Sequence, residues 1–131
     1  MSDAPRPEHC AAWFACDAPA GGVPAAFGVV TAYNPGGAVT DPEANRAADA
    51  ALKARLERSG LAHFRVTGRS KDGSHQEPGY GVAAASPEAV RHLAHEFRQL
   101  AFYWVEDGVV FLMNTDGAAR HRVAPWSERL L

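Results

Sequence analysis

The stretch FGVVTAYNPGG, residues 27–37, decides how the fold is interpreted. Its first part, Phe27 to Tyr33, is a continuous apolar and β-branched run, which is typical of a buried central strand. The run stops at Asn34-Pro35-Gly36-Gly37, where asparagine, proline and glycine favour a loop. We therefore predict a central strand that ends at this loop.

Residues 40–60 are predicted to form a long helix that follows the loop. Thr40 and Glu43 fit a capping box, and Ser59-Gly60 supplies a glycine stop. The apolar stripe consists of residues at helical spacing: Ala48, Leu52 and Leu56. Asn45 lies three residues before this stripe, so we expect an asparagine at the start of the buried face.

The remaining elements follow from the same kinds of pattern. Strands are expected at 11–16, 63–67, 79–84, 100–105 and 109–113, and a second helix at 86–99. Asp107-Gly108 between two apolar runs is a strong hairpin signal. This order predicts an α+β fold, a two-layer sandwich with two helices on one face of a mainly antiparallel sheet, in a ferredoxin-like or split β-α-β order. A mixed sheet with another strand order is the alternative.

The bulk composition indicates one domain, residues 1–131. The chain is 47% hydrophobic and 21% charged, as globular proteins are, and its length suits a single core. We expect residues 1–9 to be disordered, residues 27–113 to form the α/β core, and residues 114–131 to form a tail with no clear period.

The charge balance argues against a nucleic-acid partner. The formal net charge is −2, with 13 Lys and Arg against 15 Asp and Glu, so no basic field is available for phosphate backbones. Gly79-Tyr80-Gly81-Val82 resembles the aromatic RNA-binding stretch of RRM domains, but the preceding basic residue and the later aromatic are missing.

Nothing in the sequence points to a membrane or to export. No apolar run approaches the roughly 20 residues that span a bilayer, and the N-terminus does not have the pattern of a signal peptide. Cys10 and Cys16 are the only cysteines and do not form a CxxC pair, so we expect free thiols and a cytoplasmic protein.

Polar residues are predicted to converge at one edge of the sheet. A right-handed crossover through the first helix carries the strands at 27–33 and 63–67 in the same direction. Their ends and the helix start then share a rim that holds Thr31, Asn34, Asn45, Arg69, Ser74, His75, Glu77 and Gln99. Donors and acceptors beside a helix N-terminus suit a small polar ligand. The alternative is that the asparagines satisfy backbone groups and that the loop charges are merely solvated.

Glu77 and His75 are the candidate catalytic residues of this rim. Pro78 would hold Glu77 in place at a strand entrance, and the two side chains could act as general base and acid. Ser74, His75 and Glu77 in one loop do not amount to a nucleophilic triad.

No metal ligand set is predicted, and the cofactor stays unknown. His92 and His95 lie three residues apart on the second helix and could share a metal ion. The favoured interpretation is that both side chains face the solvent. The run HLAHE does not have the HExxH order of zinc peptidases.

Three segments of the sequence together resemble a bacterial domain-of-unknown-function family, number 3293, over roughly residues 27–113. They are FGVVTAYNPGG, GRSKDGSHQEPGYGV and LAHEFRQLAFYWV, with Asn45 between the first two. The resemblance implies a signature that maps here onto Thr31, Asn34, Pro35, Asn45, Glu77 and Gln99. It supports the rim as a site and implies no particular activity.

Two functions are therefore open. The first is binding or processing of a small polar ligand, with Asn34, Asn45 and Gln99 orienting it and Glu77 with His75 or Arg69 engaging its charged or reactive end. The second is a noncatalytic module for partner binding or homo-oligomer formation. The residues that would mediate it are Phe102, Tyr103, Trp104, Phe111, Trp126 and Leu130.

Overall fold

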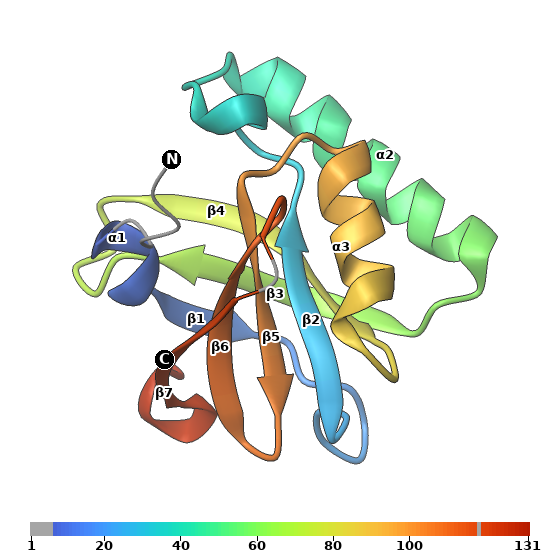
Figure 1. The fold of residues 1–131 in the computed structure, drawn as a ribbon. Coiled ribbons are helices and arrows are strands. Elements are labelled where there is room, and N and C mark those ends of the chain that lie inside the picture. The colour runs from blue at the N-terminus through green and yellow to red at the C-terminus, as the bar shows by residue number, and fades with distance from the viewer. Residues whose placement is uncertain (1–6, 118) are drawn as a thin grey trace.

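The computed structural model describes residues 7–117 and 119–131, which form an α+β fold of two long helices and a curled, seven-stranded antiparallel sheet (Figure 1). The strands are β1 (Trp13–Cys16), β2 (Ala26–Thr31), β3 (His63–Arg69), β4 (Gln76–Ala83), β5 (Ala101–Glu106), β6 (Val109–Asn114) and β7 (Arg120–Pro125). The helices are α1 (Pro7–Cys10), α2 (Pro42–Ser59) and α3 (Pro87–Glu96), with 3-10 turns η1 (Pro35–Gly37) and η2 (Trp126–Glu128). Of the segment 1–9 predicted to be disordered, residues 1–6 lie outside the described residues, and the rest begins α1.

The sheet has the order β1-β3-β4-β2-β5-β6-β7, and each neighbouring pair is antiparallel. Because β4 is antiparallel to both β2 and β3, these two strands run in the same direction, which confirms the predicted crossover. The ends of β2 and β3 and the starts of β4 and β5 therefore lie along one edge of the sheet. We call this edge the rim.

Both long helices pack on the same face of the sheet. One buried cluster joins α2 and α3 to β2, β4, β5 and β6; it contains Val30, Ala32, Leu52, Leu56, Tyr80, Val82, Val90, Leu93, Ala94, Phe102, Trp104 and Met113. The apolar stripe predicted for the first helix is thereby confirmed. Asn45 is also buried, as its place on the α2 stripe predicted.

The start of α2 differs from the prediction by one residue. The N-cap is Asp41, whose side chain accepts a hydrogen bond from Ala44 N, and Thr40 is not the cap. With Pro42 in the first turn, the capping carboxylate must stand immediately before it. The predicted glycine stop is confirmed, since Gly60 closes the helix with a φ of 68°.

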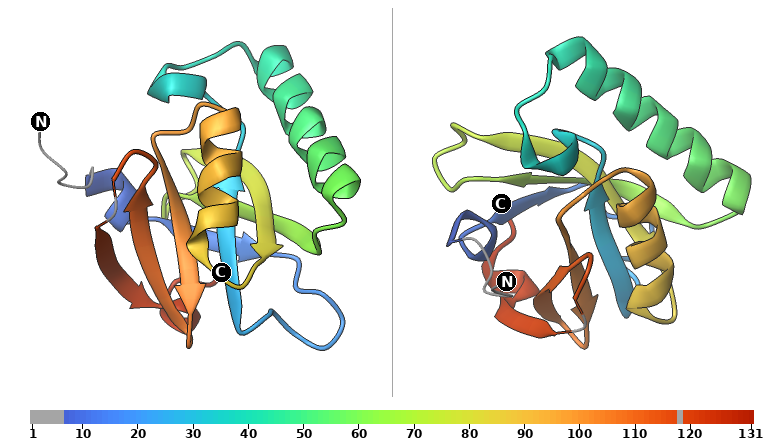
Figure 2. Two further views of the ribbon diagram at one scale, coloured as in Figure 1. Left: turned by 45° about the vertical axis from the view of Figure 1, so that its right-hand side comes forward. Right: turned by 45° about the horizontal axis from the view of Figure 1, so that its top comes forward.

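The opposite face of the sheet curls around a second core, which the expected two-layer sandwich did not include (Figure 2). This core holds Ala12, Phe14, Phe27, Val29, Phe64, Val66, Val105, Val110 and Trp126. Twist and coiling bring the two edges of a long sheet toward each other. Here β1 meets the C-terminal residues: Phe14 N donates to Arg129 O at 2.8 Å, and Leu131 N donates to Phe14 O at 3.0 Å. These bonds join the edge strand β1 to the segment after β7, so the concave face is nearly enclosed.

Within the described part of the chain, no helix has the length and apolar character needed to cross a membrane.

Candidate functional site

The concave face holds a cavity of about 850 Å³ at its rim end. Its inner wall is mainly apolar and includes Phe14, Val29, Val66, Tyr103 and Leu112. Clefts of about 300–1,000 Å³ with apolar walls and a few convergent polar groups are the usual form of small-molecule sites. The cavity therefore has the size and lining of a ligand site.

Small residues at the rim end leave this space open. Gly68 on β3 and Gly79 on β4 both line the cavity, and a β-carbon added to Gly68 would meet no other heavy atom within 4 Å. At Gly79 the added carbon would lie 2.4 Å from Val30 O, so glycine is needed there for the close approach of β4 to β2. Towards the other end of the sheet, Phe27 fills the interior, with ring centroids 5.3 Å from Phe64 and 5.2 Å from Trp126.

Six of the residues nominated from the sequence line this one cavity: Thr31, Asn34, Arg69, His75, Glu77 and Gln99. They come from the ends of β2 and β3, the start of β4 and the segment before β5, as the predicted strand direction requires. Asn45 and Ser74, the other two residues nominated for the rim, do not line the cavity.

Asn45 instead holds the loop after β2 in shape. Its Oδ1 accepts from Asn34 N at 2.9 Å, and its Nδ2 donates to Asn34 Oδ1 at 3.0 Å and to Thr40 O at 3.3 Å. Asn34 Oδ1 also accepts from Thr40 N at 3.0 Å. Asn34 has a φ of 50°, in the left-handed region that asparagine tolerates better than most residues. The two amides thus close the loop 34–40, which borders the cavity through Gly37 and Val39.

Thr31 and Gln99 also have structural partners. Thr31 Oγ1 donates to Pro78 O at 2.7 Å, and Gln99 Nε2 donates to Tyr33 O and Phe97 O, each at 3.1 Å. These bonds tie β2 to β4 and fix the segment that leads into β5. The polar side chains of the rim therefore give the mouth of the cavity its shape.

Glu77 and His75 are brought together, as the sequence predicted. His75 Nε2 lies 3.4 Å from Glu77 Oε2, and the side chains are 66% and 28% exposed, respectively. Glu77 lies opposite Gly68 in the β3–β4 register, on the strand side of the cavity. Both side chains line the cavity, and the imidazole is the more exposed of the two.

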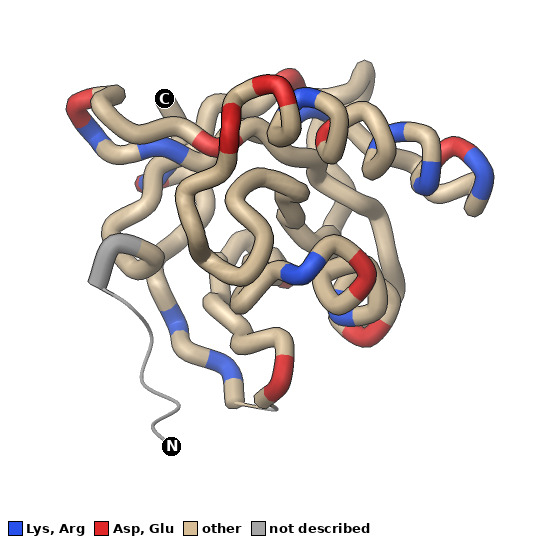
Figure 3. Tube along the Cα trace, turned by 90° about the horizontal axis from the view of Figure 1, so that it is seen from above, with Lys and Arg blue, Asp and Glu red and all other residues tan. Residues whose placement is uncertain are grey.

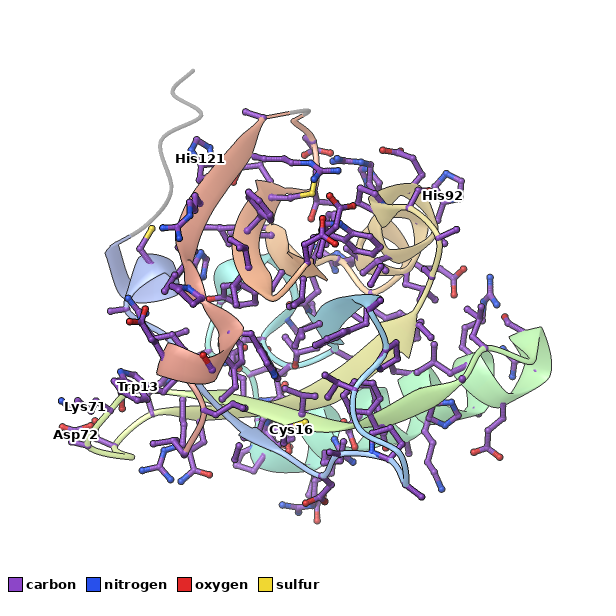
Figure 4. The ribbon with its side chains drawn as sticks, turned by 90° about the horizontal axis from the view of Figure 1, so that it is seen from below. Trp13, Cys16, Lys71, Asp72, His92 and His121 are labelled. Carbon is purple, nitrogen blue, oxygen red and sulfur yellow. The ribbon has the colours of Figure 1, made fainter. Side chains whose placement is uncertain are left out.

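Three permanently charged cations line the cavity against this one carboxylate: Arg69, Lys71 and Arg129. The Lys71 ammonium lies 5.3 Å from the centroid of the Trp13 ring, and Figure 4 shows the two side chains next to each other at one end of the molecule. Arg129 Nη1 donates to Cys10 O at 2.8 Å and to Ala12 O at 3.1 Å. Sequence reasoning missed Lys71 and Arg129. No local pattern could have found Arg129, because only closure of the sheet brings it to the cavity.

The β3–β4 turn presents its charged residues at one end of the molecule (Figure 3). Asp72 Oδ1 accepts from Ser70 Oγ at 2.7 Å, from Ser74 Oγ at 2.8 Å and from Ser74 N at 3.0 Å. These hydrogen bonds stabilise the carboxylate and lower the pKa of Asp72 to about 2. The turn that carries Lys71 and His75 is thereby held in one conformation.

Neither the histidines of α3 nor the cysteines form a further site. Within residues 7–117 and 119–131, no group of three or more His, Cys, Asp or Glu side chains could hold a metal ion. His92 is exposed on α3 (Figure 4), and His95 Nε2 lies 3.6 Å from Asp116 Oδ1. Cys10 and Cys16 are free thiols, and burial, with a smaller effect from Asp17, raises the pKa of Cys16.

The aromatic residues proposed for partner binding are largely packed in the protein interior. Phe102, Trp104 and Trp126 are buried, and Tyr103 and Phe111 are half-buried. The exposed large apolar side chains of the described residues are Val39, Leu100, Leu130 and Leu131.

Fold and cavity together define an α+β protein with a cavity on the concave face of a curled antiparallel sheet. The chain belongs to the family described as Protein of unknown function (DUF3293), whose model matches residues 30–102. That stretch contains all eight residues nominated for the rim, whereas β1 and Arg129 fall outside it. No curated protein and no solved structure matches the chain.

Proposed function

We propose that the protein binds a small molecule in the cavity of the curled sheet, with the polar part of the ligand at the rim. The observation that carries the proposal is a cavity of about 850 Å³ whose lining combines apolar side chains of the sheet with six polar residues nominated from the sequence. This combination of an apolar wall and a few convergent polar groups is the usual form of a small-molecule site.

The roles of the rim residues follow from their contacts. Asn34, Asn45 and Gln99 shape the mouth, because their hydrogen bonds run mostly to backbone and to each other. Glu77 and His75 lie together at the polar end of the cavity, where the two side chains can exchange a proton. This pair would supply acid–base chemistry if the bound molecule is also transformed.

Filling the cavity tests the proposal directly. In Gly68→Leu the new side chain enters open space, so the variant is expected to fold, and it removes volume that a ligand needs. A metabolite library is screened by thermal shift on the wild type, on Gly68→Leu and on His92→Ala, an exposed change on α3. A ligand present at about 100 times its Kd stabilises the native state by about 2.7 kcal/mol.

Compounds that raise the melting temperature of the wild type and of His92→Ala, but not of Gly68→Leu, support the proposal. Compounds that stabilise all three proteins equally bind elsewhere, and that result, or a library without any stabilising compound, contradicts it. Glu77→Gln should fold normally and change the size of the shift, because it removes the one carboxylate of the cavity lining.

We also propose that β2, α2, β3, β4, α3 and β5 form a split β-α-β unit of the ferredoxin-like kind. The central order β3-β4-β2-β5 and the packing of both helices on one face support this assignment. The strands β1, β6 and β7 are then additions that build the cavity. A crystal structure with a different order of the four central strands would contradict it.

A further inference from the structure

The two sides of the cavity mouth differ in chemical character, and this difference indicates the class of ligand. One side is apolar: Val39 on the loop after β2 is 95% exposed and Leu100 before β5 is 42% exposed, and both line the cavity. The other side, around β1 and the β3–β4 turn, carries Arg69, Lys71 and Arg129. An exposed apolar side chain is ordinary by itself, but here two of them flank an opening into an apolar interior.

The cations on the second side have donor capacity beyond their internal bonds. Lys71 contacts the face of Trp13, and the hydrogen bonds of the described residues leave its ammonium without an acceptor. Arg69 Nε donates to Ser70 O at 3.3 Å, and its terminal nitrogens, beside Gly73, make no hydrogen bond to the described residues. A guanidinium with free terminal N–H groups is well suited to a carboxylate or phosphate.

We propose that the ligand is an amphipathic anion, with an apolar chain or ring inside the curled sheet and a carboxylate- or phosphate-like head against Arg69 and Lys71. This inference rests on the proposed function, because it names the class of molecule for the same cavity. The single carboxylate of the lining, Glu77, does not cancel the positive electrostatic field of the cations at the mouth. Glu77 is paired with His75, and three cations line the cavity against it. The apolar wall excludes small hydrophilic anions as sufficient ligands, because they would leave that wall solvated.

The probe is a set of eight-carbon compounds that differ only in the head group: octanoate, octan-1-ol and octylammonium. Isothermal titration calorimetry should rank octanoate first, about tenfold tighter than octan-1-ol, because a charge-assisted hydrogen bond contributes about 1.5 kcal/mol or more. Octylammonium should bind most weakly. Decanoate should bind about fifteenfold more tightly than octanoate, since two further CH₂ groups are buried at roughly fourfold each. Acetate should not bind.

The variants separate the head group from the cavity. The double substitution Arg69→Gln with Lys71→Gln should lower octanoate affinity about tenfold, to that of octan-1-ol, and leave octan-1-ol unchanged. Arg122→Gln removes one charge from an exposed position on β7 outside the lining and should change neither. Gly68→Leu should weaken both compounds.

The outcomes distinguish the two proposals. If octan-1-ol binds as tightly as octanoate and Gly68→Leu weakens both, the anionic class is wrong and the cavity is still the site. The class is also wrong if no eight-carbon compound binds while other compounds lose their binding in Gly68→Leu. If octanoate binds equally to the wild type and to Gly68→Leu, the cavity itself is not the site, and both proposals are overturned.

Discussion

Replacing Asn45 by alanine is expected to lower the free energy of unfolding by about 2–4 kcal/mol. The side chain is 5% exposed and makes three hydrogen bonds, two with Asn34 and one with Thr40 O. A net contribution of roughly 1 kcal/mol for each bond gives about 3 kcal/mol, and the Asn34 N–H left without its acceptor adds a desolvation cost. A single domain of this size has about 5–15 kcal/mol of stability, so the variant should still fold.

The change in stability is measured by urea denaturation, and the change in the loop by hydrogen exchange. At roughly 3–5 °C for each kcal/mol, the melting temperature should fall by about 6–20 °C. The amides of Asn34 and Thr40 should exchange faster than in the wild type relative to the global unfolding rate, because both donate to this pair of side chains. The matched control is Arg46→Ala, an exposed position one residue further along α2.

A loss in Asn45→Ala no larger than that in Arg46→Ala would refute the reasoning. It would mean that water replaces the three bonds at little cost and that the loop does not depend on them. A large loss of stability with unchanged exchange in the loop would also count against it, because the energy would then lie in the packing of α2 and not in the loop.

Two further predictions concern the strands around the cavity. The Asp72 carboxyl should titrate near pH 2 by NMR, so its contribution to stability is full above pH 3.8 and is lost as the pH falls towards 2. Ser74→Ala should move the pKa of Asp72 back towards 3.8, and a wild-type pKa already near 3.8 would show that the serine bonds are absent. In urea denaturation, Gly79→Ala should destabilise the fold by about 1–3 kcal/mol, because its β-carbon would lie 2.4 Å from Val30 O. Gly68→Ala should be nearly neutral, and equal effects of the two substitutions would contradict the assigned packing.

Much of the framework could be predicted from local patterns. The apolar run that begins at Phe27 forms the central strand β2, which ends at Thr31, two residues before the predicted end. Leu52 and Leu56 form the buried stripe of α2, and Asp107-Gly108 forms the β5–β6 hairpin with positive φ at both residues. Period-two and helical patterns record which face of an element is buried, and turn residues record where it stops. The handedness of the crossover then set the direction of β3, and with it the set of residues that share the rim.

The functions assigned to individual rim residues were less predictable. Asn34, Asn45 and Gln99 were predicted to orient a ligand, and the sequence did not indicate the hydrogen bonds that these side chains make within the protein. Sequence position indicates that such amides lie near one another and does not indicate which acceptor each will find. The N-cap at Asp41 instead of Thr40 is a smaller case of the same limit, because neighbouring residues of equal capping ability compete for one position.

By itself, the amino-acid sequence determined the elements from β1 to β6, the shared face of the two helices and the edge at which Arg69, Glu77 and Asn34 meet, whereas it gave the segment that forms β7 and η2 only as a tail. Only the tertiary structure decided that the other face of the sheet curls until β1 meets the C-terminal residues, and therefore that a cavity exists and that Arg129 lines it. The physical reason is that a burial pattern depends on a few residues that are close in sequence. Closure instead depends on the coiling of seven strands and on contacts between opposite ends of the chain.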